Sequence, residues 1–369
     1  MNKIRVLLVD DTAAVRHILA DILDDDPAIE VVATAADGRE GLDRLQRVEA
    51  DLLVLDVEMP GMGGLEMLRE LKQSHPMLPV LVFSSVTERG AMVTIEALSL
   101  GACDYVPKPS MMGSPSDARD YIRATLLKKI HTLAERYLAF RPVRPAPPAA
   151  PAITTTRALR PSDQRIDLVV IGVSMGGPNA LSRLLGELPA DFPVPLLIVQ
   201  HMPAVFTRAL AQRLSSLGGM PVTECVQPQA VFAGHAWLAA GDQHMLVRRE
   251  AGQLIVEPSH EEPVNFCRPS VDTLFSSAAE AVGANLLAVV MTGMGQDGVQ
   301  GARVIRQAGG EVLVQDKESS VVWGMAGGVA GEGLADAQVS LSDLAQVIDE
   351  RVRRHRAEIP EIRRESGEG

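Results

Sequence analysis

The sequence predicts an α/β protein made of two doubly wound parallel-sheet domains that a proline-rich linker joins. Short aliphatic runs alternate with helical patterns on both sides of residues 140–162, where the chain reads FRPVRPAPPAAPAITTTRALRPS without a hydrophobic period. Hydrophobic residues make up 46% of the chain but aromatic residues only 3%. The cores must therefore be aliphatic, which suits parallel sheets covered by helices.

The first half contains five strand-then-helix units, the pattern of a five-stranded doubly wound sheet. We expect its strands within residues 4–11, 29–37, 51–60, 79–85 and 103–109. The helices that follow are expected at about 12–24, 39–48, 64–73 and 91–100, with a last one ending near 138. The predicted domain covers residues 1–125, its last helix extends beyond that boundary, and the linker occupies 139–163.

The second half repeats the alternation over residues 164–350, before a charged tail at 351–369. We expect buried parallel strands at 167–173, 194–201, 285–293 and 311–316. Between about 220 and 263, short alternating runs and turn signals predict antiparallel hairpins inserted beside the main sheet. The second domain is therefore a doubly wound, mostly parallel α/β domain with a hairpin insertion.

Composition excludes several classes of function. The formal net charge is −12, and Lys317 is the single lysine after residue 164, so the chain lacks the basic surface that nucleic-acid binding needs. Cys103, Cys225 and Cys267 are too widely spaced for a CxxC metal site or a disulfide framework. Because there is neither a signal-peptide pattern nor an apolar run of membrane-spanning length, we expect a soluble, cytoplasmic protein that is not inserted in a membrane.

Polar side chains follow the strands of the first predicted sheet, at the edge where ligands of such sheets bind. The set comprises Asp10, Asp11, Asp56, Ser84 and Lys108. Three carboxylates at one edge need a cation, and oxygen ligands suit Mg²⁺. A hydroxyl and an ammonium opposite them would bind a phosphoryl group that one carboxylate accepts. Helix capping alone would account for one or two of the aspartates, but not for the whole set.

The segments VLLVDD, LLVLDVEMPGMGG, LVFSS and YVPKP resemble the receiver domain of two-component response regulators, over residues 3 to about 125. The resemblance implies that a histidine kinase phosphorylates Asp56. It implies that Asp10, Asp11 and Asp56 surround Mg²⁺. It also implies that Ser84 and Lys108 sense the phosphoryl group.

A glycine-rich turn, GVSMGG, follows the first strand of the second half and raises three interpretations. A dinucleotide fingerprint needs glycine where Ser174 stands and an acid where Gln200 and His201 stand, so a cofactor site is not expected. Ser174 could instead be only the N-cap of the next helix. In the third interpretation Ser174 is a nucleophile, which requires a base and an orienting acid nearby.

Sheet geometry favours the nucleophile. If the runs at 168–173 and 195–200 are neighbouring parallel strands, their carboxyl ends lie only about 5 Å apart. His201 follows the second run directly, so it comes near Ser174. The strand at 285–293 leads into the loop TGMGQDG, which carries Asp297 to the same edge. Serine, histidine and aspartate would then converge as a catalytic triad. Their order along the chain differs from that of α/β-hydrolases, in which the acid precedes the histidine.

Other histidines and aspartates of the second half are weaker candidates, because none lies in a comparable loop directly after an expected parallel strand. They are His235, His244, His260 and His355, and Asp242, Asp272 and Asp316.

Five segments resemble the catalytic domain of chemotaxis protein-glutamate methylesterases, from about residue 167 to 348: IGVSMGGPNAL, IVQHMPAVFTRALAQRL, CRPSVD, MTGMGQDGVQG and QDKESSVVWGMAGGVA. The resemblance implies that Ser174 is the nucleophile, His201 the general base and Asp297 its orienting partner. It implies that the Met294 backbone amide donates to the oxyanion. The implied reaction is hydrolysis of glutamate methyl esters on chemoreceptors through an acyl-enzyme, without a cofactor. Some members of the family also deamidate receptor glutamines.

The resemblance also implies that the unphosphorylated receiver inhibits the esterase, and we expect a monomer. Two residues depart from the family pattern: Gly63, where Asp or Asn is frequent, and Met175, where threonine commonly follows the nucleophile. Two alternatives stay open, namely an inactive receptor-binding module and a methylesterase that serves a receptor array outside chemotaxis.

Overall fold

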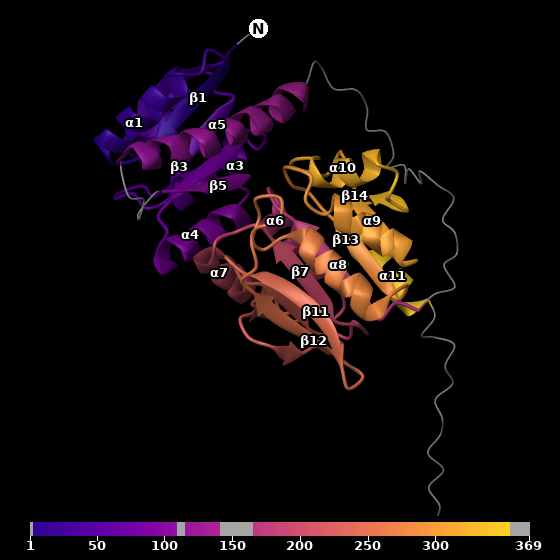
Figure 1. Ribbon diagram of the computed structural model, residues 1–369. Helices are drawn as coiled ribbons and strands as arrows, with labels where there is room; N and C mark the ends of the chain where they lie inside the picture. The colour runs from indigo at the N-terminus through magenta and orange to yellow at the C-terminus, as the bar shows by residue number, and fades with distance from the viewer. Residues whose placement is uncertain (1–2, 109–114, 141–164, 355–369) are drawn as a thin grey trace, which may run out of the picture.

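The computed structural model describes residues 3–108, 115–140 and 165–354 (Figure 1). The predicted linker and tail fall largely outside these residues. None of the described helices is long and apolar enough to cross a membrane.

The first half is a parallel five-stranded sheet in the order β2-β1-β3-β4-β5, which confirms the predicted fold. Its strands are β1 Ile4–Val9, β2 Ile29–Ala35, β3 Leu52–Asp56, β4 Val80–Ser84 and β5 Asp104–Pro107. Its helices are α1 Ala13–Asp24, α2 Gly38–Leu45, α3 Gly64–Ser74, α4 Glu88–Ser99 and α5 Pro115–Phe140. Every residue of β3 and β4 is buried, because helices cover both faces and these runs are almost wholly apolar.

The second half contains a seven-stranded sheet in the order β15-β14-β13-β6-β7-β10-β8, with all pairs parallel. Its strands are β6 Leu168–Val173, β7 Leu196–Gln200, β8 Val222–Cys225, β10 Ala236–Ala239, β13 Leu286–Val290, β14 Glu311–Gln315 and β15 Ala337–Val339. The helices of this half are α6 Gly177–Glu187, α7 Ala204–Ser215, α8 Val271–Val282, α9 Val299–Gln307, α10 Met325–Gly331 and α11 Leu344–Arg353.

The hairpin prediction is right for one part of residues 220–263 and wrong for another. An antiparallel sheet joins β11 (His244–Glu250), β12 (Gln253–Ser259) and the short β9 (Gln229–Ala230). However, β8 and β10 are parallel strands of the main sheet. All four residues of β10, AWLA, are buried. A run that is apolar on both faces belongs inside a covered parallel sheet, and its short length concealed this in the sequence.

The central strands of the second sheet are β13, β6 and β7, side by side in that order. This confirms the predicted parallel pairing of β6 with β7 and brings the chain segments after all three strands to one edge. The Ser174 N–H donates to the Thr292 carbonyl at 3.0 Å, and the His201 N–H donates to the Val173 carbonyl at 3.3 Å. The loops that carry the candidate triad are therefore held to one another by backbone hydrogen bonds.

The two halves pack against each other through α4, which lies on α7 and α6 (Figure 1). The rings of Tyr105 and Phe206 meet across this boundary with centroids 4.5 Å apart. The Asn179 side-chain amide donates to the Ala102 carbonyl at 3.2 Å. Because buried residues from both halves also form one continuous apolar cluster, the boundary is a packed interface.

Candidate active site

Ser174 lies in the turn between β6 and α6 and is partly exposed. The N-cap of α6 is Gly176, so the structure does not support Ser174 as the N-cap of that helix. A Cβ atom at Gly177 would lie 1.9 Å from Gln200 Oε1, and one at Gly293 would lie 2.9 Å from the Ser174 Cβ. These two glycines therefore let the neighbouring loops approach the serine closely.

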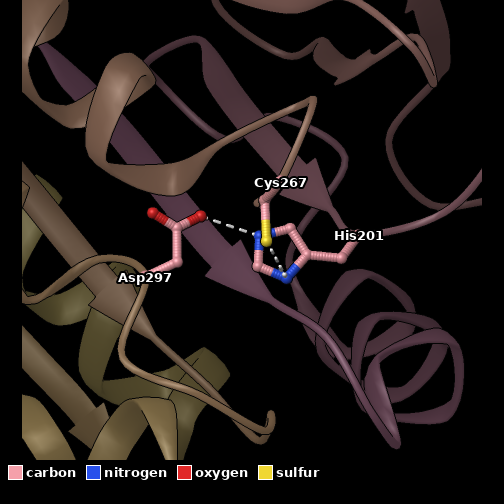
Figure 2. A group of neighbouring side chains, drawn as sticks. All are labelled: His201, Cys267 and Asp297. Carbon is pink, nitrogen blue, oxygen red and sulfur yellow. Dashed lines mark hydrogen bonds and ion pairs between the residues drawn. The ribbon is translucent and has the colours of Figure 1, made fainter. Parts of the chain in front are cut away.

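The imidazole of His201 and the carboxylate of Asp297 form a short ion pair, in which Nε2 donates to Oδ2 at 2.8 Å (Figure 2). Both side chains are largely buried. This hydrogen bond uses Nε2 and leaves Nδ1 as the nitrogen that can accept a proton. The Cys267 sulfur lies 3.9 Å from Nδ1. Among the described residues, the Ser174 hydroxyl makes no hydrogen bond, so serine and histidine are neighbours in the fold without a direct bond.

The Asp297 carboxylate is bound by the N-terminal end of α8. Oδ2 accepts from the Val271 N–H at 2.7 Å, and Oδ1 accepts from the Asp272 N–H at 3.1 Å and the Ser270 hydroxyl at 2.8 Å. The Asn265 side-chain amide also donates to Oδ1, at 3.0 Å. Burial by itself raises the pKa of Asp297, but the hydrogen bonds and the charge of His201 outweigh it and lower the pKa to about 2.

The same ion pair sets the protonation of the imidazole. Burial lowers the pKa of His201, but the hydrogen bonds and charges of Asp297 and Cys267 outweigh that effect and raise the pKa to about 9. The resting pair is therefore imidazolium and carboxylate at neutral pH.

Asp272 binds α9 in the way that Asp297 binds α8. Its Oδ1 accepts from the Gly298 N–H at 3.0 Å and the Gly301 N–H at 2.6 Å, and its Oδ2 accepts from Asn265 at 2.7 Å. Burial is the main cause that raises the pKa of Asp272, and the Asp297 charge adds to it. The N-terminal end of α8 thus binds Asp297, which precedes α9, and the N-terminal end of α9 binds Asp272 of α8. Asn265 donates to both carboxylates.

Sequence reasoning missed the roles of Asn265, Ser270 and Cys267, and it considered Asp272 only as a substitute for Asp297. All four belong to or closely precede the start of α8. The available signal was the segment CRPSVD, whose Ser-x-Asp start is typical of a helix N-terminus. The partner of that helix end, Asp297, lies 25 residues beyond Asp272, and no local pattern indicates the pairing.

Met294 lies in the loop between β13 and α9, where hydrogen bonds fix the two residues that precede it. The Gly293 N–H donates to the Val322 carbonyl at 2.9 Å, and the Thr292 hydroxyl donates to the Met175 carbonyl at 2.8 Å. Within the described part of the chain, the Met294 amide has no hydrogen-bond acceptor. It lies next to Gly293, which approaches Ser174, so its position is compatible with the predicted oxyanion donor.

Helix α5 of the first half reaches the same loops. The Thr132 hydroxyl contacts the Met294 sulfur at 3.5 Å, and Arg136 donates to the Glu318 carbonyl at 2.9 Å. Met175, the residue after Ser174, is 2% exposed and shares an apolar cluster with Leu133 of α5. The first half therefore packs directly against residues that flank the candidate nucleophile.

In the polar pocket of the first half, Lys108 and the three aspartates lie together as the sequence predicts, but the Ser84 hydroxyl is bonded elsewhere. The Lys108 ammonium binds Asp56 Oδ2 at 2.6 Å and Asp10 Oδ2 at 3.1 Å. Asp10, Asp11 and Asp56 lie close enough to share one ion. Ser84, in contrast, is fully buried, and its hydroxyl is hydrogen-bonded to Thr94 and the Gly90 carbonyl of α4 rather than to the acids.

Lys108 and the aspartates of this pocket shift one another's pKa values. Burial raises the pKa of Asp10, and the Lys108 charge only partly opposes it. For Lys108, burial acts to lower the pKa, but Asp56 and Asp10 outweigh it and raise the pKa. The oxygen-only donor set, with Asp11 exposed to solvent, fits a hard divalent cation such as Mg²⁺.

Two family models match the chain. The CheB methylesterase model matches residues 169–348, and the response regulator receiver domain model matches residues 6–114.

Curated relatives match over nearly the whole chain. A protein-glutamate methylesterase/protein-glutamine glutaminase from Trichodesmium erythraeum is 45% identical over 354 residues, which are 95% of this chain and 100% of the relative. A protein of the same name from Nocardioides sp. is 43% identical, over 96% of this chain and 97% of the relative.

Solved structures match each half. The crystal structure of the Thermotoga maritima CheB methylesterase catalytic domain is 37% identical, with a TM-score of 0.49, and the match covers 50% of this chain and 98% of that one. The response regulator domain of Thermotoga maritima CheB is 38% identical, with a TM-score of 0.33, and the match covers 36% of this chain and 98% of that one.

Proposed function

The chain belongs to the CheB methylesterase family, with a receiver domain before the catalytic domain, and from this premise we propose that it is a phosphorylation-regulated serine esterase. Its proposed substrates are glutamate methyl esters on methyl-accepting chemoreceptors, and its proposed phosphodonor is a chemotaxis histidine kinase. The observation that carries the proposal is the ion pair of His201 and Asp297 at the sheet edge that also holds the partly exposed Ser174.

In the proposed mechanism, Ser174 attacks the ester carbonyl while the neutral Nδ1 of His201 takes the hydroxyl proton. The tetrahedral intermediate then expels methanol, which receives that proton, and leaves an acyl-enzyme on Ser174. Water, deprotonated by His201, attacks the acyl group and releases the glutamate carboxylate. Asp297 stays ionised throughout, because its hydrogen bonds to α8 stabilise the charged form.

The oxyanion of each tetrahedral intermediate would accept a hydrogen bond from the Met294 amide. Support for this role comes from the Gly293 backbone, which holds the loop against Ser174. Loss of one oxyanion donor typically lowers the rate about a hundredfold or more. The same steps with ammonia as leaving group would deamidate receptor glutamines, an activity that the names of the curated relatives include.

We propose that the unphosphorylated receiver inhibits this reaction. Contacts of α5 with Met294 and with the loop at residues 317–318 support inhibition by restricting the Ser174 side of the site. Phosphorylation at Asp56 would be assisted by Mg²⁺, held by Asp10, Asp11 and Asp56, which screens the repulsion between the carboxylates and the phosphoryl oxygens. Lys108 would pair with the phosphoryl group in place of Asp10.

Ser84 suggests how the signal leaves the pocket. To bind a phosphoryl oxygen, its hydroxyl must give up its hydrogen bonds to Thr94 and the Gly90 carbonyl. Both partners belong to α4, the helix that packs on α6 and α7. Movement of Ser84 would therefore act directly on the interface between receiver and esterase.

Methanol release from methylated receptor membranes tests the proposal. We expect release by the full-length protein, a rise with a small-molecule phosphodonor and Mg²⁺, loss of release in Ser174→Ala, and loss of the rise in Asp56→Asn. Ser342→Ala, at an exposed serine, is the matched control and should behave as wild type. Equal release by wild type and Ser174→Ala would reject the esterase and favour a receptor-binding module.

A further inference from the structure

We propose that Phe266 is a docking residue that contacts the substrate polypeptide beside the modified glutamate. The inference rests on the proposed esterase function and deepens it, because it assigns one specificity-determining side chain at the mouth of the site.

Phe266 lies at the tip of a tight turn between Val264 and Cys267. These two residues exchange backbone hydrogen bonds of 3.1 and 2.9 Å, and the residues between them, Asn265 and Phe266, have φ angles of 54° and 62°. Two successive positive φ angles are typical of a type I′ turn. Asparagine tolerates this conformation, but a bulky aromatic residue adopts it rarely and at a cost in free energy.

Among the described residues, no contact of the ring offsets that cost. The Phe266 side chain is fully exposed, at 104% of its reference surface, and its neighbour Val264 is 39% exposed. By contrast, Phe83, Phe192, Phe206 and Phe275 are buried, and Phe232 packs edge-to-face against Trp237. A strained and uncovered aromatic ring contributes nothing to packing within the described residues, which points to a contact with another molecule.

The turn is anchored to the catalytic groups on both sides of the ring. Asn265 donates to Asp297 and Asp272, while the Cys267 sulfur faces His201 Nδ1. The positions flanking Phe266 are therefore fixed to the base and its acid, and the ring projects from a rigid support at the entrance of the site. A polypeptide whose ester reaches His201 Nδ1 therefore comes near Cys267, the residue next to Phe266.

The receiver is not the occupant of this surface. With the receiver packed on α6 and α7, the Phe266 ring remains fully exposed. The substrate polypeptide is the partner that must approach both the histidine and the turn. If the modified glutamate lies on a helix, an apolar side chain three or four residues away lies on the same face and can cover the ring.

The test compares two substrates, methylated receptor in membranes and a small ester such as N-acetylglutamate γ-methyl ester amide. For Phe266→Ala we expect the ratio of kcat/KM on receptor to kcat/KM on the small ester to fall about tenfold, mainly through KM, as for loss of one aromatic anchor. Phe266→Trp, which keeps an aromatic ring, should retain most of the ratio. Met77→Ala, which removes an exposed apolar side chain from the receiver, should leave the ratio unchanged.

Phe266→Gly separates docking from folding, because glycine accepts the positive φ without strain. We expect this variant to melt no lower than wild type and still to lose the receptor preference. If Phe266→Ala kept the wild-type ratio of kcat/KM on receptor to kcat/KM on the small ester, the docking inference would be wrong. The esterase proposal would still stand in that case, because the wild type is active. If wild type releases no more methanol from receptor than Ser174→Ala, the proposed function itself fails.

Discussion

Protonation of a single imidazole determines when the proposed reaction can run. His201 must be neutral to accept the Ser174 proton, but its ion pair with Asp297 raises its pKa to about 9. Because a raised pKa keeps the group protonated below that value, we expect kcat/KM for ester hydrolysis to increase as pH rises towards 9. A pH profile measured on the phosphorylated protein or on a receiver-free variant, with Ser174→Ala as background, checks this. A rate that is already maximal at pH 6 would contradict it.

Asp297 controls the position of that profile. In Asp297→Asn, the charge that raises the pKa of His201 is lost, while burial, which lowers the pKa, remains. We therefore expect the rising limb to move to lower pH and the maximum rate to fall about a thousandfold or more, because the imidazole is no longer oriented. If Asp297→Asn lost rate but its pH profile rose at the same pH as in wild type, a group other than His201 would control the profile.

Stability should follow the same ion pair. The raised pKa of His201 contributes stability that is fully present below the unfolded value near 6.5 and is lost as pH rises through about 9. The lowered pKa of Asp297 contributes stability that is present above its unfolded value and is lost as pH falls through about 2. The optimum of activity and the optimum of stability therefore lie at different pH values.

Helices α8 and α9 form a mutually capped pair, and this pairing positions Asp297, the acid of the proposed triad. Asp272→Ala would leave the Gly298 and Gly301 amides without their buried acceptor. We expect a loss of about 2–4 kcal/mol in the free energy of unfolding, measured by urea denaturation, and a lower kcat. In Asp272→Asn, which keeps one carbonyl acceptor, both losses should be smaller. Equal stability of Asp272→Ala and wild type would show that the exchange of caps is dispensable.

Strand order explains how much of the site the sequence could predict. Because Ser174, His201 and Asp297 each follow an aliphatic run, their convergence needed only the parallel pairing of β6 with β7 and β13. The choice between Nε2 and Nδ1 was not predictable, because it depends on side-chain rotamers. The role of Asn265 was also hidden, because its partner Asp297 is 32 residues away along the chain.

The secondary structure was predictable where the aliphatic runs were long, and the prediction failed where the strands were short. The four-residue strands β8 and β10 were taken for hairpin arms, because a strand of four residues is too short for its sequence pattern to distinguish parallel from antiparallel pairing. In the receiver, Ser84 was correctly expected at a strand end. Its hydrogen bonds to α4 depend on helix packing, which no strand-end pattern contains.

At the scale of the whole molecule, the receiver domain and the methylesterase domain share an interface. Under the proposed inhibition, the strength of that interface would set the basal rate. Arg136 of α5 donates to carbonyls of the loop at residues 317–318. Under the proposed inhibition, Arg136→Ala should raise methanol release by the unphosphorylated protein roughly fivefold, the equivalent of about 1 kcal/mol of lost interface contact. The fully phosphorylated rate should not change.

Arg119→Ala is the matched control for that experiment. Arg119 is on the same helix but pairs with Asp25 inside the receiver, away from the esterase. Its substitution should leave the basal rate as in wild type. If both variants activated equally, a general loosening of α5 and not the interdomain contact would be the cause.

The thiol of Cys267 beside His201 has a practical consequence for inhibitor profiling. A bulky adduct on this partly exposed sulfur would obstruct Nδ1, the nitrogen that serves the serine. Alkylating agents would then inactivate an enzyme whose proposed nucleophile is the Ser174 hydroxyl, and a routine reagent screen would misclassify it as a cysteine hydrolase. Iodoacetamide should abolish methanol release by wild type but not by Cys267→Ser, because a serine hydroxyl does not react with it. In that variant, serine-directed probes would still test Ser174 as the nucleophile.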